Sequence, residues 1–221
     1  MAPRLRRGVL ISIEGGEGSG KSTLAKELEH LLREHDYEPL LTHEPSGTPL
    51  GSAVREILDR SASAREALAP VAELLLFEAA RAQHVAAVIR PAIESGRVVL
   101  CDRYTDSTLA YQGYGRGLSL DHIRACNHIA TEGLAPQLTL LLDIEPELGL
   151  ARAGRRAEGG AGGMAAIGGD SLEFHRRVRE GFLALAGKER ERIALISGIL
   201  PPSAVVHTAW DRVRGLLERH L

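Results

Sequence analysis

The chain has 221 residues, of which 44% are hydrophobic and 25% are charged, and its formal net charge at pH 7 is -2. A chain of this length can bury a substantial core, so we expect a single domain of the α/β class over residues 1–221. The near balance of charge argues against nucleic acid or an anionic membrane as a partner, so the expected ligands are small molecules.

Cysteine content and hydropathy bear on the compartment. Cys101 and Cys126 are the only cysteines, and they lack C-x-x-C spacing, which favours a reducing environment. No apolar run approaches the length of a membrane span, and Glu14 interrupts the apolar stretch near the N-terminus. We therefore predict a cytoplasmic protein.

The strongest motif lies near the N-terminus and matches the phosphate-binding pattern G-x-x-x-x-G-K-[ST]. A strand-like apolar run over residues 9–13 precedes it, and leucines at helical spacing follow it. Glycine amides and the helix start would bind a polyphosphate, Lys21 would reach its outer phosphates, and Ser22 would hold Mg²⁺. The expected ATP-binding residues are Gly15, Gly16, Glu17, Gly18, Ser19, Gly20, Lys21, Ser22 and Thr23.

A short strand over residues 39–42 comes next, followed by a proline- and glycine-rich loop over residues 43–51. A short helix over residues 52–58 then carries Arg55. Taken alone, the loop is equally compatible with an ordinary surface turn, and Arg55 with a solvated charge.

A longer helix is predicted from about Val71 to Ile89, where Pro91 would end it. Phe77 and Arg81 are four residues apart and therefore share one side of this helix. Together they could stack on a planar base and hydrogen-bond its carbonyl, although a core position is the commoner role of a helical phenylalanine. The residues expected on the buried face are Leu74, Leu75, Ala79, Ala82 and Val85.

The apolar strand over residues 98–101 ends in two opposite charges, Asp102 and Arg103. Ligands of parallel sheets bind at the carboxyl ends of strands. Asp102 is therefore placed to reach magnesium, directly or through water, and Arg103 to bind a second phosphate; a surface ion pair is the alternative. The polar, glycine-containing segment 105–117 that follows suits a pocket wall.

The remaining elements complete an alternating pattern. A helix is predicted over residues 120–130, a strand over 138–142, an amphipathic helix after a capping box at Asp170 and Glu173, a strand over 193–196 and a helix from Ser203. Such alternation predicts a five-stranded parallel sheet wrapped by helices. Asp143, at another strand end, is as compatible with a structural role as with a catalytic one.

Residues 150–169 change composition, because three arginines lead into a glycine-rich run. We interpret this segment as a mobile lid. An arginine that closes over bound phosphates can speed phosphoryl transfer by about 10³–10⁵. The spacing does not choose among Arg152, Arg155 and Arg156, and a solvated basic linker is the alternative.

Four segments together carry a resemblance to the thymidylate kinase family. They are residues 15–23, 44–51, 77–84 and 102–113, and the most specific are Phe-x-Ala-x-Arg-Ala-Gln-His and Asp-Arg-Tyr-Thr-Asp-Ser-Thr-Leu-Ala-Tyr-Gln-Gly. The resemblance extends over nearly the whole chain. It implies the phosphate-loop fold of nucleoside monophosphate kinases, transfer of phosphate from ATP to dTMP, Mg²⁺ as cofactor and a homodimer.

The resemblance also implies roles at matching positions. Phe77 would stack on thymine and Arg81 would bond its O4, while Glu44 and Pro45 match the segment near the thymine methyl. The other matches are Ser107 and Gln112 near the base edge, Tyr111 against the sugar, Glu17 at the 3′ hydroxyl, and Arg55 and Arg103 at the acceptor phosphate.

Members of this family place a catalytic arginine either in the phosphate loop or in the lid. Gly18 occupies the loop position here, so the resemblance assigns the role to a lid arginine. The lid departs from the usual Asp-Arg-[Ile/Phe]-Glu sequence, which Ala165–Gly168 replaces. The alternative functions are a kinase for another deoxynucleoside monophosphate or small metabolite, and a nucleotide-switch protein.

Overall fold

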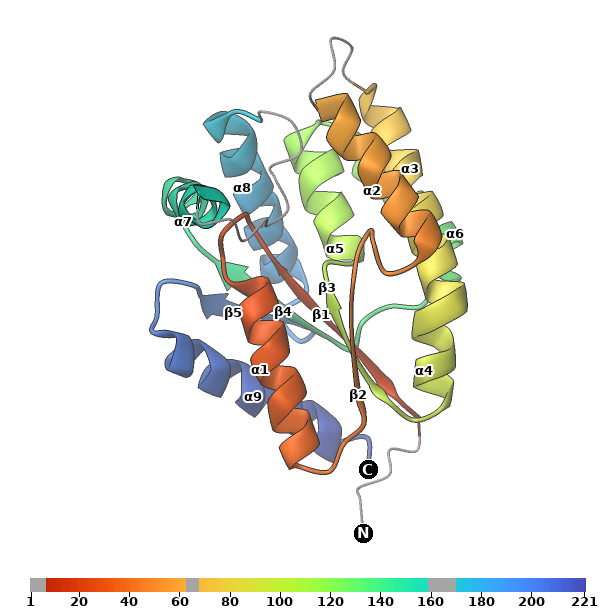
Figure 1. Ribbon diagram of the computed structural model, residues 1–221, viewed down its shortest axis with the longest axis vertical. Helices are drawn as coiled ribbons and strands as arrows, with labels where there is room; N and C mark the ends of the chain where they lie inside the picture. The colour runs from red at the N-terminus through yellow and green to blue at the C-terminus, as the bar shows by residue number, and fades with distance from the viewer. Residues whose placement is uncertain (1–6, 63–67, 159–169) are drawn as a thin grey trace.

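The computed structural model describes residues 7–62, 68–158 and 170–221, and its centre is a five-stranded parallel sheet (Figure 1). The strand order is β2-β3-β1-β4-β5, which confirms the predicted fold class. The strands are β1 (Val9–Gly15), β2 (Pro39–His43), β3 (Val98–Asp102), β4 (Leu138–Asp143) and β5 (Ile193–Ser197).

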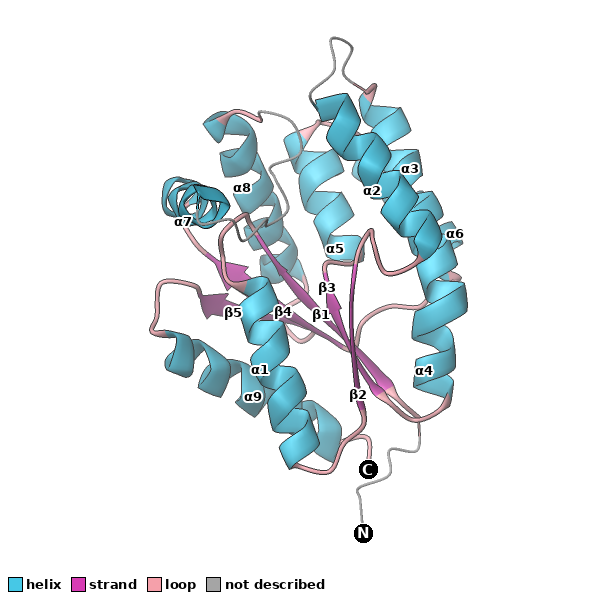
Figure 2. Cartoon of the chain, in the orientation of Figure 1, coloured by secondary structure: helices cyan, strands magenta, loops and turns pink. Residues whose placement is uncertain are grey.

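Helical segments connect the strands (Figure 2). The α-helices are α1 (Lys21–Glu34), α2 (Pro49–Ala62), α3 (Pro70–His84), α4 (Arg90–Glu94), α5 (Thr105–Thr108), α6 (Leu120–Thr131), α7 (Pro146–Glu158), α8 (Leu172–Lys188) and α9 (Pro202–Glu218). Two π-helical segments, η1 (Val85–Ile89) and η2 (Leu109–Gly115), continue α3 and α5.

The alternation of side chains along the strands divides the core between the two faces of the sheet. Ile11 and Ile13 of β1 face α1 and α9, where they pack near Leu28. Leu10 faces the opposite side and packs with η1 and α4, while Leu141 of β4 packs with α8 on that same side. The apolar runs over residues 9–13, 98–101 and 138–142 are therefore buried central strands, whereas β2 and β5 lie at the edges of the sheet.

The parallel register brings the carboxyl ends of the strands to one edge of the sheet. Ile13 of β1 lies opposite Asp102 of β3, and Gly15 lies opposite Leu142 of β4. The phosphate-binding motif leaves the sheet at this edge, between the ends of β3 and β4.

The predicted helix end at Pro91 is wrong. The chain stays helical from α3 through η1 into α4, and Pro91 lies in the first turn of α4. Proline has no backbone N–H to donate, and at this junction of η1 and α4 the chain stays helical without that hydrogen bond.

Three of the α3 positions predicted to be buried are exposed instead. Leu75 is 55% exposed, and Ala79 and Ala82 are also exposed, whereas Leu74 and Val85 are buried as predicted. The helix contacts its neighbours through a narrower stripe than its apolar content suggests.

The start of α8 also differs in detail from the prediction. Ser171, and not Asp170, caps the helix, because its Oγ accepts a hydrogen bond of 3.2 Å from the N–H of Phe174. Asp170 is engaged elsewhere, with Arg116. Across the described ranges, no helix combines the length and the hydropathy that a bilayer crossing requires.

Candidate active site

The phosphate-binding motif forms the loop between β1 and α1, as predicted. Gly18 and Gly20 have φ angles of 65° and 100°, in the left-handed region that glycine adopts without strain. These two residues allow the loop to curl before the helix begins at Lys21.

Lys21 turns back over the loop. Its Nζ donates hydrogen bonds to the carbonyl oxygens of Gly15 (3.1 Å) and Gly16 (2.8 Å). Burial and the nearby charge of Arg103 lower the pKa of Lys21 to about 7. A bound polyphosphate would favour the charged ammonium, since an opposite charge within a few ångströms stabilises the protonated form.

Ser22 and Asp102, the two predicted magnesium ligands, lie side by side. Ser22 Oγ donates a hydrogen bond of 2.7 Å to Asp102 Oδ2. The serine is exposed and the aspartate is half-buried. A hydroxyl and a carboxylate are hard oxygen ligands of the kind that Mg²⁺ prefers, so this pair fits the ion.

Arg103 adopts an unusual backbone conformation, with φ of 72°. A non-glycine residue in this region carries strain of order 1–3 kcal/mol, which the surrounding structure must hold. The N–H of Arg103 donates to Ile13 O (3.0 Å), and the N–H of Tyr104 donates to Glu14 Oε1 (2.7 Å). The end of β1 thus fixes the turn that aims the arginine.

Glu14 also connects to the Arg103 side chain through Ser107. Ser107 Oγ donates to Glu14 Oε2 at 2.6 Å and accepts from Arg103 Nη1 at 3.2 Å. Burial and the neighbouring Asp106 raise the pKa of Glu14 to about 8. Arg103 Nη2 donates to the Tyr111 hydroxyl at 3.2 Å, and its guanidinium carbon lies 4.9 Å from the centre of that ring.

A cavity of about 490 Å³ opens beside Arg103, and we call it the acceptor cavity. Every residue predicted to bind dTMP lines it except Glu17 and Arg55. The described lining residues are Glu44, Pro45, Glu73, Phe77, Arg81, Arg103, Ser107, Thr108, Tyr111, Gln112, Arg116 and Asp170. Aromatic walls with a few converging polar groups are typical of a ligand site.

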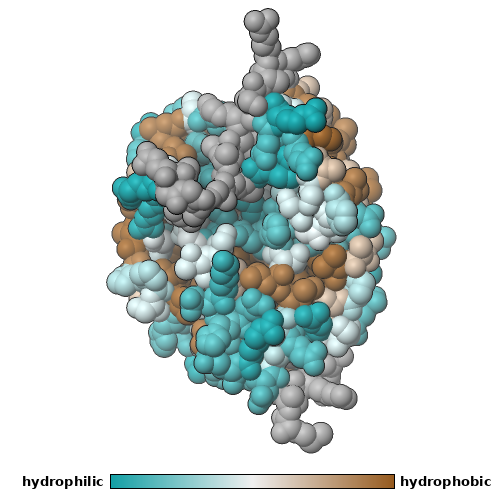
Figure 3. All heavy atoms as spheres, in the orientation of Figure 1, coloured by the Kyte–Doolittle hydropathy of each residue, from teal (hydrophilic) through white to brown (hydrophobic). Residues whose placement is uncertain are grey.

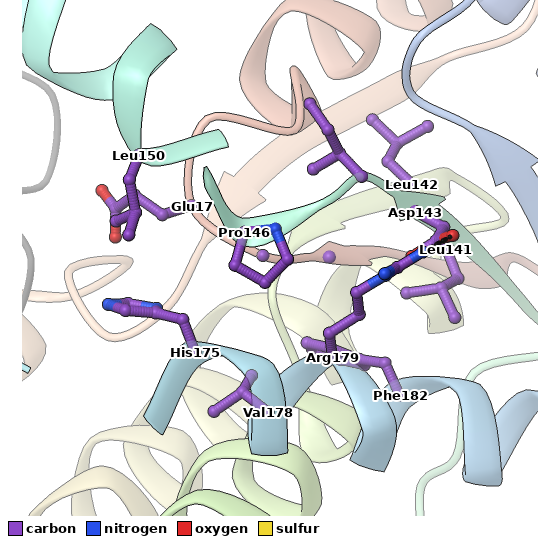
Figure 4. A pocket seen from close by; sticks show the side chains of 13 residues that line it. Glu17, Leu141, Leu142, Asp143, Pro146, Leu150, His175, Val178, Arg179 and Phe182 are labelled. Atoms are coloured by element: carbon purple, nitrogen blue, oxygen red, sulfur yellow. Dashed lines mark hydrogen bonds and ion pairs between the residues drawn. The ribbon is translucent and has the colours of Figure 1, made fainter. Parts of the chain in front are cut away.

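Arg55 and Glu17 lie apart from the acceptor cavity. Arg55 pairs with Asp59 on α2, and it is not among the described residues that line the cavity. Glu17 lines a second cavity of about 390 Å³, bounded by the end of β4, the start of α7 and helix α8 (Figure 4). There Arg179 donates to both carboxylate oxygens of Asp143, at 2.7 and 3.0 Å, which gives Asp143 a structural partner.

Arg81 lines the acceptor cavity, but protein acceptors already engage its guanidinium. Nε and Nη2 contact Glu44 Oε2 at 2.9 and 2.8 Å, and Nη2 also donates to Tyr104 O at 3.2 Å. Nη1 donates to Glu78 Oε1 and Asn127 Oδ1, both at 2.8 Å. Five contacts match the five N–H groups of an arginine. A bond to a base carbonyl would therefore require one of them to be shared or released.

Glu44 belongs to a further cluster of potential ligand atoms. Its carboxylate, the His84 ring and the Cys101 thiol lie within 4.8 Å of one another. However, Glu44 is the ion-pair partner of Arg81 at 2.8 Å, and His84 Nε2 is hydrogen-bonded to Thr42 at 2.7 Å. A cation at this position would face the charge of Arg81, and Glu44 is the member of the cluster that orients that arginine.

The far end of the acceptor cavity carries a network of charged side chains. Glu73 accepts hydrogen bonds from Gln112 Nε2 (2.7 Å) and from Arg116 Nη2 (3.2 Å). Arg116 also pairs with Asp170, just beyond residues 159–169, and lies over the ring of Phe174 at 4.3 Å.

The predicted lid begins within α7. Arg152 Nη1 donates to Gly198 O at 2.9 Å, which joins α7 to the segment after β5, while Arg155 is exposed. The side chain of Arg156 and the rest of the predicted lid, residues 159–169, lie outside the described residues. Ala165–Gly168, where the sequence departs from the family pattern, belong to that part.

Helix α7 meets the phosphate loop backbone to backbone. A Cβ added at Gly18 would lie 2.0 Å from Gly149 O, and one added at Gly149 would lie 2.3 Å from Glu17 O. Real Cβ atoms do not approach a carbonyl oxygen this closely. With α7 in this position, residue 18 has no room for a side chain.

Sequence reasoning missed three residues of this site, Glu14, Glu73 and Asp170, whereas Thr108 and Arg116 lie in the segment 105–117 that was expected to form a pocket wall. Glu14 left a recognisable signal, because it is the only charged residue in the strand Val9–Gly15. A charge in a buried strand needs partners, and partners near a ligand loop point to function. The others left no local signal.

Known proteins resemble this chain in sequence and in fold. A family model described as thymidylate kinase matches residues 13–209. The chain is 50% identical to a thymidylate kinase of Synechococcus sp. (strain JA-2-3B'a(2-13)), over 93% of this chain and 94% of that protein. It is 49% identical to a thymidylate kinase of Desulfovibrio desulfuricans, over 96% and 97%. Among solved structures, a thymidylate kinase from Ehrlichia chaffeensis superposes with a TM-score of 0.74 at 30% identity, covering 94% of this chain and 99% of that one.

Proposed function

The chain belongs to the thymidylate kinase family, and on that premise we propose how its residues transfer the γ-phosphate of ATP to dTMP. The observation that carries the proposal is the position of Arg103. Its Nη1 lies 3.5 Å from Gly15 O of the phosphate loop, and its side chain lines the acceptor cavity. Donor and acceptor phosphates would meet at this arginine, whose positive charge would offset part of the charge of both.

On the donor side, the amides of residues 15–23 bind the ATP phosphates. Lys21 leaves the carbonyl oxygens of Gly15 and Gly16 for the outer phosphates, where its ammonium opposes the charge of the transferred group. Ser22 and Asp102 would hold Mg²⁺, which when bound neutralises the donor phosphates and draws them into line.

On the acceptor side, Phe77 stacks on thymine, and Ser107 and Gln112 lie along the base edge. Tyr111 contacts the deoxyribose and Arg103 the phosphate of dTMP. Arg81 and Glu44, paired at 2.8 Å, form the wall next to the base together with Pro45. A phosphate oxygen of dTMP is an adequate nucleophile once aligned, so no covalent enzyme intermediate is required.

Residues 150–169 act as the lid in this proposal, and one of Arg152, Arg155 and Arg156 stabilises the transferred phosphoryl group. The lack of room for a side chain at Gly18 supports a lid arginine over a loop arginine. Glu17 and Arg55 keep their proposed roles at the 3′ hydroxyl and the acceptor phosphate.

We also infer that the chain forms a homodimer through α3 and α6, which pack against each other. Val71 and Leu75 of α3 are 54% and 55% exposed, and Ile129 of α6 is 76% exposed. Apolar residues also gather at the edge of the molecule beside α2 and α3 (Figure 3). A dimer would bury them. The free cysteines Cys101 and Cys126 are in keeping with a cytoplasmic location.

A coupled assay with MgATP tests the proposal by offering dTMP, dUMP, dCMP, AMP or no acceptor. We expect the highest kcat/KM with dTMP. Preference for dCMP or AMP would point to another nucleotide kinase. Hydrolysis without any acceptor would point to a nucleotide switch.

A further inference from the structure

Glu73 and Gln112 form a hydrogen-bonded pair at the wall of the acceptor cavity. Glu73 lies on α3, four residues before Phe77 and therefore on the same side of the helix. Its carboxylate accepts a 2.7 Å hydrogen bond from Gln112 Nε2, and the two residues are 6% and 3% exposed. Both line the acceptor cavity.

Arg116 makes the direction of this hydrogen bond obligatory. Its Nε and Nη2 donate to Glu73 at 3.3 and 3.2 Å, so Glu73 is the anionic partner of an arginine. An ionised carboxylate can only accept hydrogen bonds. Gln112 must therefore turn its NH₂ group toward Glu73, and its carbonyl oxygen takes the opposite position. Among the described residues, no side chain or amide donates a hydrogen bond to that oxygen.

We infer that Glu73 is a specificity-determining residue, which fixes the amide of Gln112 so that its carbonyl oxygen selects a pyrimidine with a proton on N3. This inference rests on the proposed function, in which Gln112 lies along the base edge. Thymine carries an N3–H donor and meets an acceptor. Cytosine carries an N3 acceptor and would meet a second lone pair.

The hydrogen bonds of Arg81 indicate that base specificity depends on a second residue as well. Protein acceptors already engage the Arg81 guanidinium, so its contact with O4 competes with Glu44, Glu78 and Asn127. The free oxygen of Gln112 has no such competitor among the described residues. Sites that pair a substrate's polar groups reject an unmatched analogue strongly, because buried groups would be left unpaired.

The test compares kcat/KM for dTMP, dUMP and dCMP in the wild type and in Glu73→Gln. The neutral amide no longer forces the orientation of Gln112, so we expect the dTMP/dCMP ratio to fall by about tenfold or more. The dTMP/dUMP ratio and the KM for ATP should stay unchanged, because uracil also carries N3–H and the donor loop is untouched. A general structural defect would not produce this pattern.

Asp170→Asn is the matched control. It removes the other carboxylate partner of Arg116 but leaves the Glu73–Gln112 hydrogen bond in place. We expect this variant to keep the dTMP/dCMP ratio of the wild type. An equal fall in both variants would assign the effect to Arg116 and overturn the inference.

Gln112→Met provides a second route should Glu73→Gln fail to fold. It removes the carbonyl oxygen at similar volume and should lower the same ratio. If both single variants fold, the double variant should show no further fall, since the two residues act as one unit. An unchanged ratio in folded Gln112→Met, or independent additive effects, would refute the inference. Failure of the wild type to phosphorylate dTMP would instead refute the proposed function itself.

Discussion

Ser22 Oγ lies 2.7 Å from Asp102 Oδ2, which joins the first turn of α1 to the carboxyl end of β3. If this pair holds Mg²⁺, Asp102→Asn should raise the Mg²⁺ concentration for half-maximal activity by about 10- to 100-fold. A Mg²⁺ titration of the coupled assay measures this. Asp143→Asn, at the end of β4, is the control. It loses the ion pair with Arg179 and should lower stability without changing the Mg²⁺ requirement.

We expect Lys21 to take up a proton when ATP binds. Its pKa of about 7 in the free protein means that most of the ammonium has lost its proton at pH 8. Bound phosphates favour the charged form, so binding at pH 8 should take up roughly one proton per site. Calorimetry in two buffers of different ionisation enthalpy measures the uptake. It should disappear in Lys21→Met and persist in Lys26→Met, an exposed position on the same helix.

Glu14 predicts a pH dependence of stability. Its pKa is raised from 4.5 to about 8 by burial and Asp106. At a pH between these two pKa values, Glu14 holds a proton in the folded protein but has released it in the unfolded chain. The contribution of Glu14 to the free energy of unfolding therefore falls as pH rises, by at most about 1.4 kcal/mol per unit.

Glu14→Gln should remove this slope, since glutamine does not titrate. Urea unfolding of both proteins between pH 5 and pH 8 gives the comparison. Parallel curves for the two proteins would show that Glu14 does not titrate in this window.

We expect even an alanine at residue 18 to destabilise the protein. Gly18→Ala would require a left-handed alanine and a Cβ 2.0 Å from Gly149 O, so α7 would have to move. We expect a loss of stability of about 1–3 kcal/mol and a lower kcat. Gly16→Ala is the control, because a Cβ there meets nothing within 4 Å. Equal thermal melting shifts in the two variants would contradict the predicted contact.

We expect alanine variants of the three lid arginines to differ strongly in kcat. Arg152→Ala, Arg155→Ala and Arg156→Ala should include one whose kcat falls by about 10³-fold or more, since only one arginine reaches the transferred phosphoryl group. For Arg152, the hydrogen bond to Gly198 O predicts a raised KM for ATP as well. Three small and similar losses would exclude a single catalytic arginine.

The fold could be predicted because its signals are local. Each strand is a short apolar run, and the phosphate loop is a contiguous motif whose neighbours have the right periodicity. Asp102 and Arg103 were placed at the correct edge of the sheet for the same reason, because they directly follow a recognisable strand. The exposed face of α3 could not be predicted, because periodicity identifies an apolar stripe but not what covers it.

The partners of site residues could not be predicted, because they are distant in the chain. Arg81 is separated from Glu44 by 37 positions and from Asn127 by 46, and these contacts change how its guanidinium is used. Glu14 and Ser107 are 93 positions apart. Only the folded structure shows that Glu14, a residue of β1, orients Arg103 beside the acceptor cavity.

The close approach of Gly18 and Gly149 has a consequence for how such enzymes diverge. An arginine at residue 18 cannot coexist with α7 in this place, so one design cannot change into the other by a single substitution. The helix would first have to move away from the loop. A loop arginine therefore requires the loop and the helix to change together.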